Sequence, residues 1–144
     1  MKYKFMNISN HPSIRWSEKQ LDATREYAPA PEGLCAVEDL RFPNVPADAE
    51  ERTLRAFCAD IVGTVNVRIN EGYNVTCMVQ GESTLTYMIV DRLLAAGIKC
   101  VAATTERNTI ENEDGSKTVS FDFVRFREYV KYNSFYKKEV DDYE

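Results

Sequence analysis

The sequence predicts an α/β domain with three layers, in which a mostly parallel sheet lies between helices. Up to about residue 103, short apolar segments with strand character alternate with segments of helical periodicity. This alternation is typical of parallel strands joined by right-handed helical crossovers. After that point the apolar residues recur with a period of two around a turn signal, which predicts a C-terminal antiparallel hairpin.

The N-terminal part predicts two strands and one short helix. Residues 3–8 read as the first strand. Ser17 with Gln20 three residues later fits a capping box, which favours a helix over 18–27. A connection containing two prolines follows, because proline breaks both helix and strand. Residues 34–42 form the second predicted strand.

The middle of the chain carries the strongest helical signal. Apolar residues recur there at steps of three and four, at Leu54, Phe57, Cys58, Ile61, Val62, Val65 and Ile69. They form one face of an α-helix. A third strand is predicted over 75–79. A second long helix follows it and ends near Gly97, and residues 98–103 form a short apolar fourth strand suited to the interior of a parallel sheet.

The last predicted element is the hairpin, over 108–126. Val119, Phe121 and Phe123 alternate with polar residues, and Asp114-Gly115 is a hairpin turn signal. The predicted architecture is therefore a single Rossmann-like domain over residues 1–130. A charged and aromatic tail over 131–144 follows it.

Composition excludes several classes of function. The chain has 144 residues, a net charge of -5 and a pI near 5.0, which argues against a surface for duplex DNA or an anionic membrane. No secretory signal and no membrane-spanning run is visible, so a cytoplasmic location is expected. With one histidine and four cysteines without a CxxC pair, we expect reduced cysteines, no metal site and no cofactor.

Polar residues follow each predicted parallel strand. Open parallel sheets bind ligands outside the carboxyl ends of their strands, so these groups are the candidate site. They are Ser9, Asn10 and His11 after the first strand, Asn44 after the second, Gly81, Glu82, Ser83 and Thr84 after the third, and Thr105, Glu106 and Arg107 after the fourth.

Each group has a plain structural explanation beside a functional one. Asn and Ser often form turns or caps, and a loop histidine is often only solvated. His11 at a strand end is also well placed to move a proton or contact phosphate. The segment 81–84 is suited to capping a helix or holding an anion, although Glu82 opposes an anion. Arg107 is suited to clamping a phosphate. No GxGxxG, P-loop or GxSxG motif is present, which disfavours dinucleotide enzymes, P-loop NTPases and α/β-hydrolases.

The motifs carry a resemblance to a known group. They are Asn7-Ile8-Ser9-Asn10-His11-Pro12, Trp16-Ser17-x-x-Gln20, Phe42-Pro43-Asn44-Val45-Pro46, Gly81-Glu82-x-Thr84-x-Thr86-Tyr87, Gly97-Ile98-Lys99-Cys100, Thr104-Thr105-Glu106-Arg107 and Phe123-Val124-x-Phe126-Arg127-Glu128-Tyr129. From about residue 4 to 129, the chain resembles small stand-alone relatives of the CRISPR-associated Rossmann-fold (CARF) domain. That resemblance implies binding of a cyclic oligoadenylate by a homodimer in antiviral defence. In the related ring nucleases it also implies cleavage of the ring.

The leading hypothesis is therefore a homodimeric, metal-independent ring nuclease that acts through the candidate residues. A ribose 2′-hydroxyl would attack the adjacent phosphate. His11 would act as acid or base, and Arg107 and helix N–H groups near Ser83 would stabilise charge. We expect His11, Glu82 and Arg107 to face one cleft, and residues 126–136 to supply part of the dimer contact. Two alternatives are a non-catalytic nucleotide-binding or interaction module, and a flavodoxin-like domain with FMN phosphate at residues 9–13.

Overall fold

The computed structural model describes residues 1–132 and contains one five-stranded sheet in the order β2-β1-β3-β4-β5. The first four strands are parallel, and β5 is antiparallel to β4. The predicted α/β class, the mostly parallel sheet and the antiparallel hairpin are confirmed. The strands are β1 (Lys2–Ser9), β2 (Val37–Arg41), β3 (Tyr73–Val79), β4 (Lys99–Glu111) and β5 (Lys117–Glu128).

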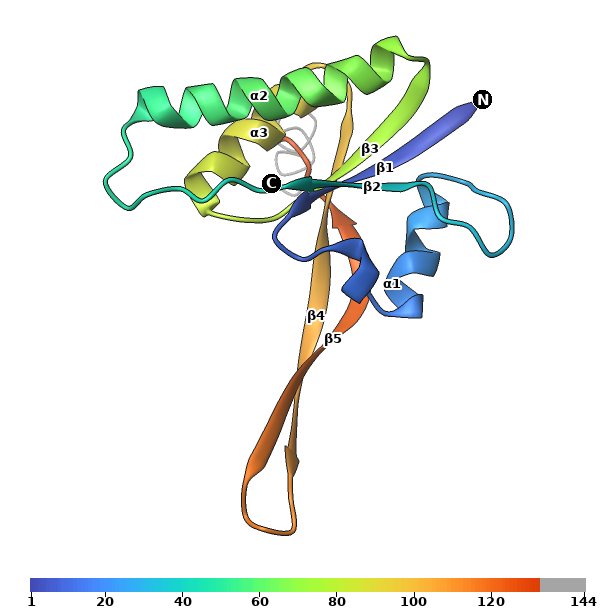
Figure 1. The fold of residues 1–144 in the computed structure, drawn as a ribbon, viewed down its shortest axis with the longest axis vertical. Helices are drawn as coiled ribbons and strands as arrows, with labels where there is room; N and C mark the ends of the chain where they lie inside the picture. The colour runs from blue at the N-terminus through green and yellow to red at the C-terminus, as the bar shows by residue number, and fades with distance from the viewer. Residues whose placement is uncertain (133–144) are drawn as a thin grey trace, which may run out of the picture.

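Helices cover both faces of the sheet. The helices α2 (Glu51–Asn70) and α3 (Ser83–Ala95) lie on one face and α1 (Glu18–Ala23) on the other (Figure 1). The chain moves outward from β1 to β2 and then in the opposite direction to β3 and β4, so right-handed crossovers place the helices on opposite sides. The strand order therefore reverses between β1 and β3, which is where open sheets of this kind bind ligands.

Each face of the sheet has its own apolar core. Beneath α2 and α3, fully buried side chains such as Val65, Leu85 and Ile89 pack on the inner strands. Beneath α1 the core is aromatic. Phe5 of β1 lies 6.2 Å from Trp16 and 5.0 Å from Phe126 between ring centroids, distances at which edge-on and tilted ring pairs are stabilising.

Element boundaries differ modestly from the predicted ones. Ser17 caps α1 as its motif predicts, accepting from the Gln20 N–H at 3.2 Å. The helix gives way after Ala23 to a 3₁₀ turn, Thr24–Glu26. The second strand covers residues 37–41, within the predicted 34–42.

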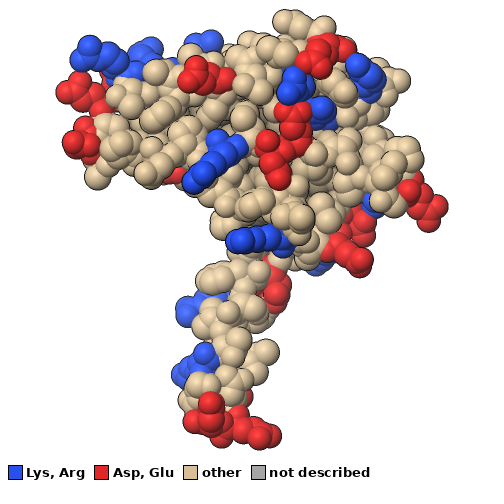
Figure 2. Space-filling model, viewed as in Figure 1, with Lys and Arg blue, Asp and Glu red and all other residues tan. Residues whose placement is uncertain are grey.

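The fourth strand differs most from the prediction. It pairs with β3 only from Lys99 to Val101 and then continues with β5 as its sole partner, through Glu111. Beyond this point the pair forms an arm, residues 104–125, whose outer part stands clear of the body of the molecule (Figures 1 and 2). Residues 104–107 are therefore strand residues at the base of the arm and not a loop at the end of a strand.

Two further predictions concern the ends and the surroundings of the chain. Most of the predicted tail, 131–144, lies outside the described residues. Phe126, predicted to contribute to a dimer contact, is only 3% exposed in the aromatic core, so it is not available for one. Within residues 1–132, no helix is both long and apolar enough to cross a membrane.

Candidate functional site

The carboxyl ends of three parallel strands meet at one edge, as predicted. The Phe42 N–H donates to the Ser9 carbonyl at 3.2 Å, and the Gln80 N–H donates to the Ile8 carbonyl at 3.1 Å. The loops after β1, β2 and β3 therefore begin side by side. Only the fourth predicted group departs from this arrangement, because β4 runs past the edge into the arm.

Gln80 joins the end of β3 to the base of the arm. Its side-chain Oε1 accepts from the Ala103 N–H at 2.8 Å, and its Nε2 donates to the Ala103 carbonyl at 3.2 Å. The amide side chain thus imitates one more residue of strand beyond Val79. This pairing fixes the point at which β4 leaves the sheet.

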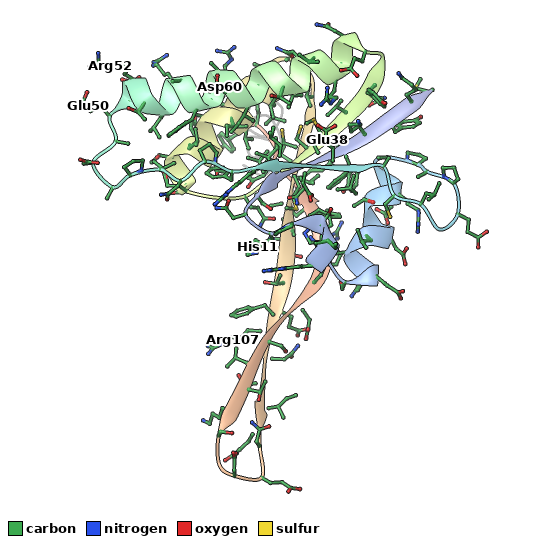
Figure 3. All side chains as sticks on the ribbon, viewed as in Figure 1. His11, Glu38, Glu50, Arg52, Asp60 and Arg107 are labelled. Atoms are coloured by element: carbon green, nitrogen blue, oxygen red, sulfur yellow. The ribbon has the colours of Figure 1, made fainter. Side chains whose placement is uncertain are left out.

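A cleft of about 610 Å³ lies between this edge, the arm and the segment that leads into α1. Its size falls in the usual range of ligand sites, about 300–1,000 Å³. His11 lies at the base of the arm, beside the cleft (Figure 3). The lining residues are Asn10, His11, Pro12, Arg15, Trp16, Ser17, Gln20, Met78, Gln80, Ala103, Thr105, Phe121, Asp122 and Phe123.

A buried polar network holds the loop that carries His11. Asn7, 1% exposed, donates from Nδ2 to the His11 carbonyl at 2.8 Å and to Asp39 Oδ1 at 3.0 Å. Ser9 Oγ donates to Asn7 Oδ1 at 2.6 Å and accepts from the His11 N–H at 3.1 Å. Ser9, a predicted ligand residue, is therefore buried and occupied in positioning the loop. Asp39 extends the network to Ser13, whose N–H and hydroxyl both donate to it.

Trp16 packs beneath the loop and also holds it. Its indole Nε1 donates to the His11 carbonyl at 3.0 Å. The ring is 9% exposed and lies against Phe5 and Phe126. These buried contacts give Trp16 a packing role.

Arg15 supplies the positive charge of the cleft, and the sequence prediction missed it. Its guanidinium makes no ion pair within the described part of the chain, and it lines the cleft together with His11. Arg41, also without an ion pair among residues 1–132, lines a neighbouring hollow that shares Asn10 and Pro12 with the cleft. The sequence could have indicated both arginines by their positions. Arg15 lies in the loop after the first predicted strand, and Arg41 lies at the end of the second.

The start of α3 is not an open anion site. The Glu82 carboxylate accepts from the Thr84 N–H at 2.7 Å and from the Leu85 N–H at 3.4 Å, and it also accepts from the Thr84 hydroxyl. These bonds, chiefly the one from the Thr84 side chain, lower the pKa of Glu82. A side-chain carboxylate thus occupies the place that a bound phosphate would take. The N–H groups of Thr84 and Leu85 are therefore already bonded to Glu82, and the role of N–H groups near Ser83 in charge stabilisation stays a prediction.

Gly81 has a packing role. A Cβ built on it would overlap the ring of Phe42, which is 1% exposed at the end of β2. The absence of a side chain lets the loop after β3 cross closely over this ring. That contact accounts for the glycine without a ligand.

The remaining predicted residues lie around the cleft at different distances. Thr105 lines it, whereas Glu106 follows on the arm. Arg107 lies farther out still (Figure 3). Asn44 is exposed in the loop after β2. His11, Glu82 and Arg107 do not share one cleft, because neither Glu82 nor Arg107 lines that of His11.

The cysteines are placed as packing residues. Cys58, Cys77 and Cys100 are buried, Cys35 is half-buried, and all four are free thiols. Burial raises the pKa of Cys77 well above its usual range and that of Cys100 to about 12. In the described residues, no three His, Cys, Asp or Glu side chains are grouped so as to hold a metal.

The fold and the site define a class: a Rossmann-like α/β protein with a cleft where the strand order reverses. The chain belongs to the uncharacterized protein MJ1673 family, whose model matches residues 3–127. No curated protein and no solved structure matches it.

Proposed function

We propose that this protein binds a cyclic oligoadenylate and places one nucleotide of the ring in the His11 cleft, as part of a CRISPR-linked defence pathway. One observation carries the proposal: the cleft at the point of strand reversal combines an exposed histidine, an arginine free of ion pairs and an accessible aromatic ring. These are the side chains that recognise a nucleotide outside a duplex. The choice of a cyclic oligoadenylate rests on the motif resemblance.

Each part of a nucleotide has a partner of suitable chemistry. Phe121, 67% exposed, offers a face on which a base can stack. Arg15 offers a guanidinium for two charge-assisted hydrogen bonds to a phosphate. The ring of an even-numbered oligoadenylate has two-fold symmetry, so two copies of the chain would present two such clefts to it.

A more specific form of this proposal is that the protein also cleaves the cyclic oligoadenylate. The ribose 2′-oxygen would attack the adjacent phosphorus as the bond from phosphorus to the 5′-oxygen breaks, leaving a 2′,3′-cyclic phosphate and a 5′-hydroxyl. His11 would take the proton from the 2′-hydroxyl or give one to the 5′-oxygen. Arg15, rather than Arg107, would meet the charge on the phosphate.

A second candidate is a binding module without turnover, and one observation favours it. The His11 imidazole makes no hydrogen bond to a side chain in the described part of the chain, although the His11 carbonyl accepts from Asn7 and Trp16. A catalytic base is commonly oriented by a third group. Recognition needs only the loop to be fixed, which the network around Asn7 achieves.

The experiment that tests both candidates uses the full chain with cyclic tri-, tetra- and hexa-adenylate. Calorimetry measures binding, and chromatography of the mixture detects linear products with and without EDTA. Linear adenylates of matched length serve as controls. Absence of binding to all three rings would contradict the proposal. Tight binding with an intact ring over hours would leave the binding module and remove the enzyme.

The role of His11 is then separated by one variant. His11→Ala would slow single-turnover cleavage by on the order of 10²–10⁴ if the imidazole moves a proton, while binding falls much less. If only binding falls, His11 is a contact residue. Circular dichroism of the variant checks that the loop substitution leaves the fold intact.

A further inference from the structure

A second hollow adjoins the His11 cleft, and the proposed function leaves it empty. It has a volume of about 290 Å³ and is lined by Asn7, Ser9, Asn10, Pro12, Asp39 and Arg41. Asn10 and Pro12 also line the cleft. We name these two residues the Asn10–Pro12 ridge, because the cleft lies on one side of them and the hollow on the other.

Strand pairing places Arg41 on the same side of the sheet as the cleft. Arg41 is the last residue of β2 and the register partner of Ser9, the last residue of β1. Because side chains alternate along a strand, Arg41 projects from the same face as Val37, which packs against the aromatic core beneath α1. The segment that carries Arg15 leads into α1 on this side, so both arginines serve the same face.

The cleft and the hollow each contain one aspartate beside one arginine, but the aspartates already have partners. Asp39 in the hollow accepts from the Asn7 amide at 3.0 Å and from the Ser13 hydroxyl at 3.1 Å. Asp122 in the cleft accepts from the Asn108 amide. Protein donors therefore compensate part of the negative charge, which opposes an anion less than a bare carboxylate would.

The arginines have no such partners. Within residues 1–132, the guanidinium groups of Arg15 and Arg41 form neither a hydrogen bond nor an ion pair with the protein. Both residues are exposed. A guanidinium carries five N–H donors and no acceptor. Each arginine can therefore give two hydrogen bonds to a phosphate without losing a contact that the fold uses.

We propose that Arg15 and Arg41 bind two successive phosphates of one ligand, whose backbone crosses the Asn10–Pro12 ridge between them. This inference rests on the function proposed above and deepens it, because it assigns the site to an oligonucleotide with at least two phosphates and not to a mononucleotide. The nucleotide whose base stacks on Phe121 would occupy the cleft, and the next one would extend into the hollow. The hydrogen bond from Asn7 to the His11 carbonyl holds the ridge in place.

The first experiment uses the cyclic oligoadenylate that wild type binds most tightly, titrated by calorimetry at several salt concentrations. Arg41→Ala should weaken binding about tenfold or more, the effect of losing a hydrogen bond to a charged group. It should also make the salt dependence less steep, because fewer counterions are released. Arg92→Ala is the matched control and should change neither quantity. Arg92 is also exposed and forms no ion pair among the described residues, but it lies in the last turn of α3 and lines neither space.

The outcomes separate this inference from the proposed function. If wild type binds no ring, the proposed function fails and the inference fails with it. If wild type binds a ring but Arg41→Ala keeps the affinity and salt dependence of wild type, only the inference is overturned. An equal loss in Arg92→Ala would show a general effect of charge and would overturn it as well. Circular dichroism checks that each variant is folded.

The second experiment separates the two phosphate positions. The probes are linear adenylyl-adenosine (ApA) and its trimer ApApA, which contain one and two phosphodiesters, followed by NMR titration. Arg15→Ala should weaken both, whereas Arg41→Ala should weaken ApApA and change the affinity for ApA by less than about threefold, below the effect of a lost charged hydrogen bond. An equal loss of ApA and ApApA in Arg41→Ala would mean that both arginines hold one phosphate, and it would overturn the inference. Equal affinity of wild type for the two probes would contradict a second phosphate contact.

Discussion

Asn7 donates a hydrogen bond from its buried amide to the carbonyl of His11, at 2.8 Å. The same amide group also donates to Asp39, while its oxygen accepts from Ser9. Strand β1 thus fixes the backbone of the loop that follows it. The neighbouring strand β2 supplies Asp39, whose carboxylate is the second acceptor of the Asn7 amide. The buried side chain of Asn7 therefore fixes the position of His11.

The first prediction concerns Asn7→Asp. The new carboxylate would lose the two donations from the amide and lie at hydrogen-bond distance from the exposed Asp39 carboxylate, so a buried negative charge would face a like charge without a donor. We expect the free energy of unfolding at pH 7 to fall by about 3 kcal/mol or more. Repulsion would raise the pKa of the introduced group in the folded state, so stability should partly recover toward pH 5. Urea denaturation at both pH values checks this, and an unchanged midpoint would contradict the role of the network.

The second prediction concerns Glu38, which joins three elements. Its carboxylate accepts from Arg68 of α2 at 2.8 Å and from Lys4 of β1 at 2.9 Å. The Arg68 hydrogen bond is the main cause of a lowered pKa for Glu38. A lowered native pKa means that the stabilisation is complete above the unfolded value near 4.5 and is lost as the pH falls through the native value.

Glu38→Gln should therefore lower the free energy of unfolding by about 1 kcal/mol at pH 7, a small value because the group is partly exposed. The difference from wild type should disappear at acidic pH, once the native carboxyl is protonated. Denaturation curves between pH 7 and pH 3 measure it. A difference independent of pH would show that the side chain acts by packing and not by charge.

The sequence predicted those parts of the fold that local patterns determine. The faces of α2 and α3, the Ser17 cap and the strands β1 and β3 follow from periodicity and capping residues, which act within a few positions. The gathering of Asn10, His11 and Gln80 at one edge follows from parallel topology alone. Such features need no knowledge of which distant residues touch.

The sequence could not give the end of β4. The apolar run stops at Ala103 because burial between sheet and helix stops there, yet the strand continues because β5 provides its hydrogen bonds. Whether a residue is buried and whether its backbone pairs with another strand are separate properties. Residue type indicates mainly whether the residue is buried. Arg107 was consequently placed in a loop near His11, whereas it lies out along the arm.

The sequence partly predicted that the N-terminus of α3 is not open to an anion. A glutamate at the capping position competes with any anion for the same N–H groups, and Glu82 does so. The fit of Gly81 over Phe42 was not visible, since it depends on the crossing of two loops separated by almost forty residues.

The third prediction uses that crossing. Gly81→Ala would place a methyl group in the ring of Phe42, so the loop or the ring must move, at a cost of about 1–3 kcal/mol in the free energy of unfolding. Gly63→Ala is the matched control, because nothing lies within 4 Å of a Cβ at Gly63 and alanine is favoured in a helix by up to about 1 kcal/mol. Thermal denaturation should lower the midpoint of the first variant and leave or raise that of the second. Equal midpoints would contradict the close packing.

The fourth prediction concerns thiol reactivity. Burial raises the pKa of Cys58, Cys77 and Cys100, and the thiolate is the reactive form. A thiol-specific reagent at pH 7.5 (about one unit below the usual thiol pKa) should modify Cys35 first in the folded protein. Mass spectrometry of the labelled protein identifies the site, and denaturation should expose the other three. Rapid labelling of Cys77 in the native protein would contradict its burial.

The last prediction distinguishes the cation of the cleft from the one that the sequence favoured. Arg15 lines the cleft with His11 and makes no ion pair in the described part of the chain, whereas Arg107 lies on the arm and does not line it. If a phosphate binds there, Arg15→Ala should weaken affinity for the ring by about 10- to 100-fold, the usual effect of losing a hydrogen bond to a charged group. Arg15→Lys should retain part of the affinity, because it keeps the charge but not the paired hydrogen bonds. Arg107→Ala should change affinity by less than about threefold, below the effect of a lost charged hydrogen bond. Calorimetric titration at two salt concentrations measures all three variants. A larger loss for Arg107→Ala than for Arg15→Ala would move the phosphate site from the cleft to the arm.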